Sequence, residues 1–168
     1  NWPFWRSWTE HARIRAASRV LCGMSNQPRG LIKGLSSYVI KTGMKCRAQG
    51  RNTSTPPVLV GAVQAAIDDF DTHNYFPEMQ QEIFARDRRD GESFTHLVPD
   101  GHGMLDAVTF EPEHVGEPPN TDLLTDKYGV ITRKGNTTQV EAFWVAFDGN
   151  FGAGEEIPAS EVLHTKVN

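Results

Sequence analysis

The sequence predicts an α+β fold in which N-terminal helices are followed by a mostly antiparallel β-sheet. Two observations support this prediction. Before residue 91, apolar side chains recur every three or four residues, as they do on one face of a helix. After residue 91 they recur every second residue, in short runs separated by turns that contain Gly, Asn and Pro. Helices and strands that occupy separate parts of a chain are typical of the α+β class.

Two helices are expected in the first 48 residues. The stretch 7–24 carries a helical stripe, and Arg residues lie mostly off it. The stripe consists of Trp8, Ile14, Ala17, Val20, Leu21 and Met24. The second helix, over 29–42, follows Asn26, which can cap it, and ends before Gly43, which suits a left-handed position. Residues 43–48 could continue as a short strand.

Two more helices are expected over 57–71 and 77–89, where a proline occupies the first turn of each. Beyond Gly91 the alternating runs predict strands over 94–98, 105–110, 130–132, 140–147 and 162–167. The run VEAFWVAF is apolar on both faces, which indicates a central strand. The polar turn RKGNTT joins this strand to GVIT as a hairpin.

Charge is divided unevenly along the chain. Residues 1–55 hold ten Lys or Arg and one acid, whereas residues 56–168 hold seven Lys or Arg and twenty acids. The sign changes at the polar, turn-rich stretch QGRNTSTPP, which is typical of a linker. We therefore predict a basic helical segment over 1–55 and an α+β domain over 56–168. A split of this size concerns partners or assembly more than folding.

Composition excludes several classes of protein. The longest apolar run, VLVGAVQAAI, is too short to span a bilayer, and no signal-peptide pattern is found, so neither a membrane nor a secretory role is expected. Two cysteines are too few for a disulfide framework or a structural zinc site. Leu, Ile, Val and Phe make up 38 of 168 residues, only just above the roughly 20% below which chains tend to be disordered. A core this small indicates that a neighbouring surface completes the fold.

Catalytic motifs are weak. His96, His102 and His114 lie close in sequence to acids such as Glu111, but their spacing does not match a known metal site. A metal-dependent hydrolase built on these residues is the least favoured hypothesis, and we expect no enzyme activity and no cofactor. The stretch RDRRDGE (86–92) is either an anion or interface clamp or an ordinary helix end, and the helix end is favoured because Arg suits a helix C-terminus. Nucleophile and nucleotide-binding motifs are not found.

The basic segment allows two interpretations. Its cations could neutralise DNA phosphates, which would make the chain a DNA-binding module. However, the aromatic residues near the N-terminus precede most of the cations instead of alternating with them, as a stacking groove would require. Docking on an acidic neighbouring subunit also explains the acidic remainder, so we favour assembly.

Four stretches, taken in order, resemble the N-terminal region of the lambda-like portal proteins of tailed bacteriophages. The first is ARIRAASRVLCGMSNQPRGLIKGLSSYVIKTGMKC, with its basic helix, break at Pro and second helix. The others are QQEIFARDRRDGESFTHLVPDGHGMLDAVTFEPEHV, YGVITRKGNTTQVEAFWV and IPASEVLHTKVN. The resemblance extends from about Ala12 to Asn168. The sequence that follows IPASEVLH in the family, which forms the stem, clip and tunnel loop, is not present, so we expect a fragment of a longer subunit.

The resemblance implies a structural protein of the virion and not an enzyme. Portal proteins form homo-oligomeric rings, typically dodecameric, at one capsid vertex, and DNA passes through the ring during packaging and ejection. Implied partners are the terminase, the capsid, the head–tail adaptor proteins and double-stranded DNA, in the host cytoplasm during assembly and in the virion afterwards. This chain would form part of the peripheral wing.

The residues expected at the subunit interface form two sets of opposite charge. The positive set is Arg13, Arg15, Arg19, Arg29 and Lys33, and the negative set is Asp68, Asp69, Asp71, Glu78 and Glu82. A head-to-tail ring would bring the two sets together between neighbouring subunits. Phe110 and Trp144 are expected in the core of the sheet, because they lie in the most apolar strands.

Overall fold

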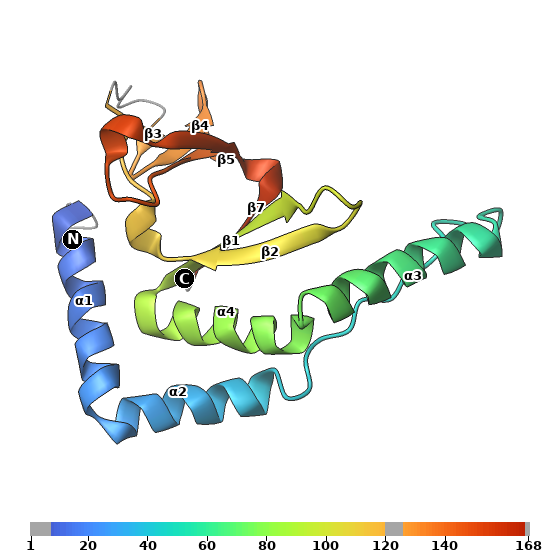
Figure 1. Ribbon diagram of the computed structural model, residues 1–168, viewed down its shortest axis with the longest axis horizontal. Coiled ribbons are helices and arrows are strands. Elements are labelled where there is room, and N and C mark those ends of the chain that lie inside the picture. The colour runs from blue at the N-terminus through green and yellow to red at the C-terminus, as the bar shows by residue number, and fades with distance from the viewer. Residues whose placement is uncertain (1–7, 120–125, 167–168) are drawn as a thin grey trace.

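Helices and strands occupy separate parts of the molecule (Figure 1). The computed structural model describes residues 8–119 and 126–166. Within these ranges, four α-helices come first and two small antiparallel sheets follow, which confirms the α+β class. The helices are α1 (Trp8–Met24), α2 (Asn26–Val39), α3 (Pro57–His73) and α4 (Phe76–Asp90).

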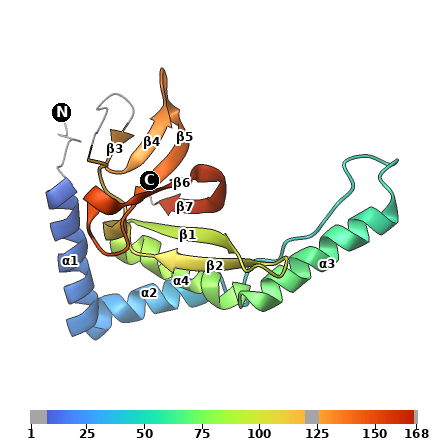
Figure 2. The same cartoon turned by 45° about the horizontal axis from the view of Figure 1, so that its top comes forward.

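The helices form a frame around one side of the sheets. Helices α1 and α2 meet at a corner, and both pack against α4. Helix α3 points away from the rest of the molecule as an arm (Figure 2). None of its residues is buried. This arm therefore contributes little to the core of the single chain.

The second helix begins earlier than the sequence predicts. Ser25, not Asn26, is the N-cap: its backbone is extended, and its side-chain oxygen accepts a hydrogen bond from the Gln27 amide at 3.4 Å. Gly43 does take the left-handed conformation expected of it, with φ +89°. The predicted strand over 43–48 is wrong, because the Gln80 side-chain amide bonds both the N–H and the C=O of Met44 and so replaces a neighbouring strand.

The first sheet has the order β2–β1–β7 and packs against α4. Its strands are β1 (Glu92–Pro99), β2 (Leu105–Phe110) and β7 (Val162–Lys166). Gly91, with φ +89°, ends α4 and lets the chain reverse directly into β1. All three strands agree closely with the sequence prediction.

The second sheet has the order β3–β4–β5–β6. Its strands are β3 (Asp126–Lys127), β4 (Val130–Arg133), β5 (Asn136–Val145) and β6 (Glu155–Pro158). Strand β5 lies between β4 and β6, as its two apolar faces predict, although it begins and ends earlier than 140–147. Neither β3 nor β6 was predicted. Short 3₁₀ turns, η1 (Pro112–His114), η2 (Phe151–Ala153) and η3 (Ala159–Glu161), connect the strands.

The hydrophobic core lies between the two sheets. Phe94 is at its centre, stacked on Phe110 and edge-to-face with Phe143, each at 5.5 Å between ring centroids. The other buried members are Val115, Val145, Ile157 and Val162. Phe110 is in the core as predicted, whereas Trp144 is half-buried and donates its indole N–H to the Phe151 carbonyl at 3.0 Å.

The basic segment and the remainder of the chain are in contact. Gln80 and Gln81 on α4 bond the backbone of the segment that follows α2, at Met44 and Lys41. The division at residue 55 stays a prediction. In the two described ranges, every helix is too short or too polar to cross a membrane.

Candidate interaction surface

Helix α1 turns its polar face toward the molecule and its apolar face outward. Its inner side is formed by Arg15, Arg19 and Cys22, which are all at least partly buried. On the outer side, Leu21 is 59% exposed and Met24 is 85% exposed. The helix is where the sequence predicts it. The part of the apolar stripe from Ile14 to Met24, however, faces solvent and not the core.

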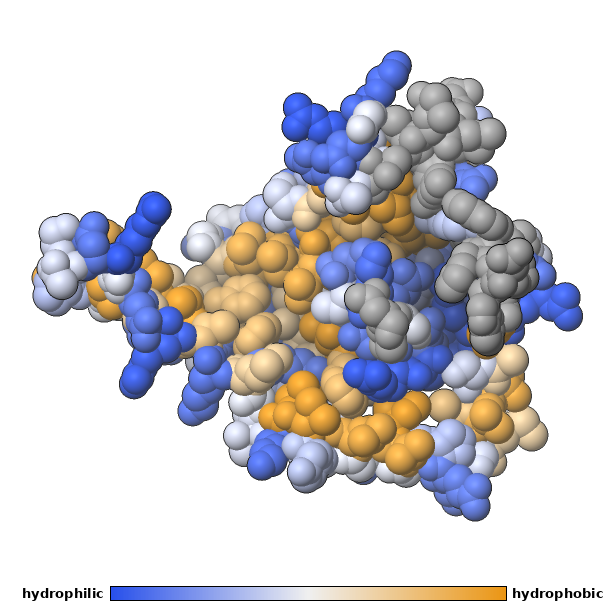
Figure 3. Space-filling view, turned by 180° about the vertical axis from the view of Figure 1, so that it is seen from behind, coloured by the Kyte–Doolittle hydropathy of each residue, from blue (hydrophilic) through white to orange (hydrophobic). Residues whose placement is uncertain are grey.

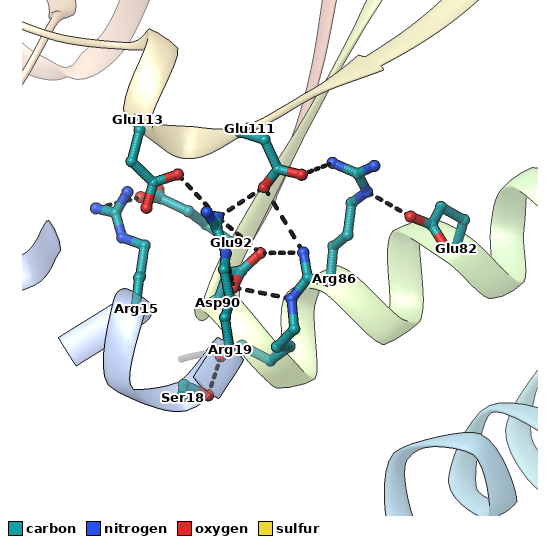
Figure 4. Close-up of polar contacts among 10 residues, drawn as sticks. Arg15, Ser18, Arg19, Glu82, Arg86, Asp90, Glu92, Glu111 and Glu113 are labelled. Carbon is teal, nitrogen blue, oxygen red and sulfur yellow. Dashed lines mark hydrogen bonds and ion pairs between the residues drawn. The ribbon is translucent and has the colours of Figure 1, made fainter. Parts of the chain in front are cut away.

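The inward face is held by charge. Arg19 bonds Asp90 at the end of α4 through two contacts, Nε–Oδ1 at 2.9 Å and Nη2–Oδ2 at 3.1 Å. Its Nη2 also bonds Glu111 at 2.6 Å and Glu113 at 2.8 Å, on either side of the start of η1 (Figure 4). The Asp90 side chain is completely buried. One arginine thus joins three parts of the chain.

The arginines of the stretch RDRRDGE belong to the same network. Arg89 pairs with Asp90 at 2.7 Å, and Arg86 bridges Glu82 at 2.7 Å and Glu111 at 2.8 Å. The Ser18 hydroxyl donates to the Arg89 carbonyl at 2.6 Å, which closes the end of α4 against α1. The stretch is therefore the end of a helix, as favoured, and also a clamp within the chain.

A second ion pair holds the middle of α1. Arg15 lies 3.3 Å from Glu92 on β1, and the other Glu92 oxygen lies 3.1 Å from the His164 ring on β7. His164 stacks on Phe94 with 4.3 Å between ring centroids. The ion pair therefore lies directly beside the aromatic core.

Asp90 and Glu92, two carboxylates bound to the arginines of α1, have shifted pKa values. Burial alone would raise the pKa of Asp90, but hydrogen bonds from Arg89 and Arg19 outweigh burial and lower it. At Glu92, burial would likewise raise the pKa. The hydrogen bond from His164 and the charge of Arg15 outweigh burial, so the pKa of Glu92 is lowered. For Asp87 burial prevails, and its pKa is raised. Asp90 and Glu92 are therefore stabilised in their charged forms.

A groove of about 560 Å³ lies between α2 and α4. Five of the ten residues predicted for the interface line it: Arg19, Arg29, Lys33, Glu78 and Glu82. The structure thus brings members of both charge sets together inside one chain. Arg29 is used locally as well, since its Nε donates to the Cys22 carbonyl at 3.1 Å. An interface role for these residues stays a prediction.

The other predicted interface residues lie apart from the groove. Arg13 is exposed on the outer face of α1, beside Ile14 and Ala17. Asp69 is exposed on α3. Asp68 accepts a hydrogen bond from Gln64 at 2.8 Å, and Asp71 lies with it along a hollow between α3 and the 44–47 segment.

Apolar side chains are exposed on α2 and α3 as well as α1. On α2, Leu31 is 64% and Val39 is 54% exposed, and Figure 3 shows hydrophobic surface along the edge that α2 forms. On the arm, Val58 is 83% and Leu59 is 55% exposed. Single exposed apolar residues are normal on a protein surface, but here they recur on three consecutive helices. Exposed apolar surfaces of this kind mark interaction sites.

The three histidines singled out in the sequence do not form a ligand set. Within residues 8–119 and 126–166, no group of three His, Cys, Asp or Glu side chains is placed to hold a metal ion. His96 lies 3.6 Å from Glu161, and His102 belongs to the turn that Asp100 caps. His114 packs beside Phe110 and Phe147. The hydrolase hypothesis gains no geometric support.

The sequence interpretation missed the acidic partners of α1. Asp90 and Glu92 were considered only as part of the stretch RDRRDGE, and Glu111 only beside the histidines of the hydrolase hypothesis. Glu113 was not considered, and none of the four was proposed as a partner of α1. A usable signal existed: Arg15 and Arg19 are four residues apart, so both point to the side opposite the apolar stripe.

The chain matches neither a protein-family model nor a curated protein.

Proposed function

We propose that this chain is part of the wing of a tailed-phage portal protein, a structural, ring-forming subunit. Four motifs in the family's order support the proposal, together with the division of charge along the chain. The structural observation that carries it is the orientation of α1, whose arginines bond the molecule while its apolar residues face solvent. A neighbouring subunit would cover these residues.

The energetic reason is the cost of exposed apolar area. Each large apolar side chain removed from water contributes about 1.5 to 3 kcal/mol when burial is complete. The residues left open on α1, α2 and α3 include Leu21, Met24, Leu31 and Val58. In a closed ring every subunit has two neighbours and buries one of its exposed surfaces against each of them. No such surface then remains open at an end.

A ring also accounts for the partners that the resemblance implies. The proposed subunit would assemble with further copies of itself and contact the terminase, the capsid and the head–tail adaptor, while DNA passes through the channel. Its place would be the host cytoplasm during assembly and the portal vertex of the virion afterwards. In this proposal the chain itself performs no catalysis.

The DNA-binding alternative is less well supported. Arg15 and Arg19 are bound to carboxylates, and the exposed Arg29 is bound to backbone carbonyls, so these three cations already have partners within the chain. Phosphate binding requires cations that can reach a duplex. The alternative still predicts micromolar duplex affinity that falls steeply between low and moderate salt, and no binding at low salt would exclude it.

Electron microscopy of the full-length polypeptide tests the proposal. Negatively stained particles are expected to be rings of uniform subunit number with a central channel. Particles the size of one subunit would contradict it if they persist at protein concentrations above about 10 μM, which exceed the dissociation constants of most stable assemblies.

A further inference from the structure

The two ends of the molecule carry helices whose outer faces leave apolar side chains exposed. Helix α1 lies at one end of the longest axis and the α3 arm lies at the other (Figures 1 and 2). The two helices therefore cannot cover each other within one subunit. They are placed to meet between two subunits arranged head to tail, which is the arrangement that generates rings.

The outer face of α1 presents one row of exposed residues at helical spacing. The row consists of Arg13, Ala17, Val20 and Met24. Val20 is 57% exposed and Met24 is 85% exposed. A cation at one end and apolar residues along the rest make this row a surface for a helix of matching pattern.

The α3 arm presents a row with the same spacing and the opposite charge. The row consists of Val58, Ala62, Ala65 and Asp69, all exposed. Val60, Gln64 and Ile67 lie on the other side of α3, toward the rest of the chain, and are partly buried. The exposed row is thus the side of the arm that a neighbour can reach.

The two rows match in antiparallel order. In each row the first and last residues are eleven positions apart, or about 16 Å at the rise of an α-helix. Aligned antiparallel, Asp69 meets Arg13, Ala65 meets Ala17, Ala62 meets Val20 and Val58 meets Met24. The alanines at the middle allow a close approach of the two helices.

We propose that the α3 arm of one subunit packs antiparallel on the outer face of α1 of the next subunit. The occupant of this face is therefore a second copy of this chain. Charge favours this occupant over an α1–α1 contact, because α3 supplies the carboxylate of Asp69 opposite Arg13. The interface rests on the proposed ring and specifies which helices close it.

Charge reversal tests the pairing. The full-length polypeptide is prepared with Arg13→Glu, with Asp69→Arg and with both changes, and the concentration at which half the subunits are assembled is measured by mass photometry. Each single change is expected to raise this concentration about fivefold, because an exposed attraction becomes a repulsion. The double variant is expected to recover to near the unmodified value. Both positions are exposed, and circular dichroism checks that the helices remain.

A disulfide test fixes the direction of the pair. In a Cys22→Ser, Cys46→Ser background, Met24→Cys with Val58→Cys is expected to give a covalent ladder of subunits on oxidation. The matched control, Met24→Cys with Asp69→Cys, places the thiols about 16 Å apart in the antiparallel pair and is expected to give none. A stronger ladder from the control would overturn the antiparallel arrangement.

The outcomes separate this interface from the ring itself. Rings that form equally well with Arg13→Glu and with Asp69→Arg, or a double variant no better than the single ones, would overturn the interface and leave the proposed function standing. An unmodified polypeptide that stays monomeric would overturn both.

Discussion

Arg19 and Asp90 form a two-point ion pair that joins α1 to the end of α4, with Nε–Oδ1 at 2.9 Å and Nη2–Oδ2 at 3.1 Å. The Asp90 carboxylate has no exposed surface, and Arg89 is its other cation. This buried pair therefore fixes α1 against the end of α4. Because α1 turns its arginines toward α4, its apolar side is left available to a partner.

Removing the arginine is expected to destabilise the chain. In Arg19→Met the buried carboxylate of Asp90 keeps only Arg89, and Glu111 and Glu113 lose a shared cation. We expect a loss of about 2 to 4 kcal/mol in the free energy of unfolding, somewhat under the range for an uncompensated buried charge. Urea unfolding followed by circular dichroism measures it. The matched control is Arg13→Met on the exposed face, where about 0.5 kcal/mol or less is expected; equal losses in the two variants would contradict the role of Arg19.

Acid is expected to release α1. The pKa values of Asp90 and Glu92 are lowered from their ordinary values of 3.8 and 4.5. Their contribution to stability is therefore complete above the ordinary values and is lost as pH falls below them toward the folded-state values. The raised pKa of Asp87 acts in the opposite direction, so its contribution improves as pH falls through that raised value toward its ordinary one.

Unfolding free energy measured from pH 7 to pH 3 checks this dependence. The stability of the unmodified chain should decrease below about pH 4.5, the ordinary pKa of the Glu92 side chain. In Asp90→Asn the decrease should be smaller, because an amide does not titrate, although the variant starts less stable at pH 7. An unchanged decrease in Asp90→Asn would show that Asp90 is not a source of the pH dependence.

Gly129 is expected to be intolerant of any side chain. It has φ +80° in the turn between β3 and β4, and a Cβ there would collide with the backbone of Gly116. Gly135, in the β4–β5 hairpin, has a similar φ of +82° with open space around it. Gly135→Ala should therefore cost about 1 kcal/mol for left-handed backbone alone, whereas Gly129→Ala should cost about 3 kcal/mol or more because overpacking is added.

Thermal or urea unfolding of the two alanine variants gives the comparison directly. The difference between them isolates the clash, since the backbone conformation is nearly the same. Similar losses in both variants would mean that the close approach of Gly116 and Gly129 is not maintained in solution.

The outer face of α1 should matter for assembly and not for the stability of one subunit. Leu21 is 59% exposed, so Leu21→Ser should change the free energy of unfolding by about 0.5 kcal/mol or less. Phe94 is 1% exposed in the core, and Phe94→Ala should cost about 3 to 5 kcal/mol. Urea unfolding at concentrations below assembly measures both. A large loss in Leu21→Ser would place this face in the core of the single chain.

Local patterns predicted the helices and most strands because their signals lie within a few residues. Gly91 stops α4, and the turn RKGNTT sets the β4–β5 hairpin. Strand β6 was missed because only Ile157 among its four residues is buried, so it has no recognisable apolar run.

The orientation of α1 could not be predicted from α1 alone. An apolar stripe identifies a helix but does not say whether the core or a partner covers it. Here the answer depends on Asp90, Glu111 and Glu113, which are more than 70 positions away in the sequence. For the same reason, the two predicted charge sets gave no sign that Lys33 and Glu82 line one groove of the same chain.

The mass of the full-length polypeptide in solution distinguishes an assembled ring from a single subunit. Light scattering is performed across a salt series, because exposed complementary charges are screened as the Debye length falls to about 3 Å at 1 M salt. We predict one discrete high-order ring at low salt and a shift toward smaller species at high salt. A monomer at every salt concentration would contradict the claim that a second copy of this chain covers the exposed faces.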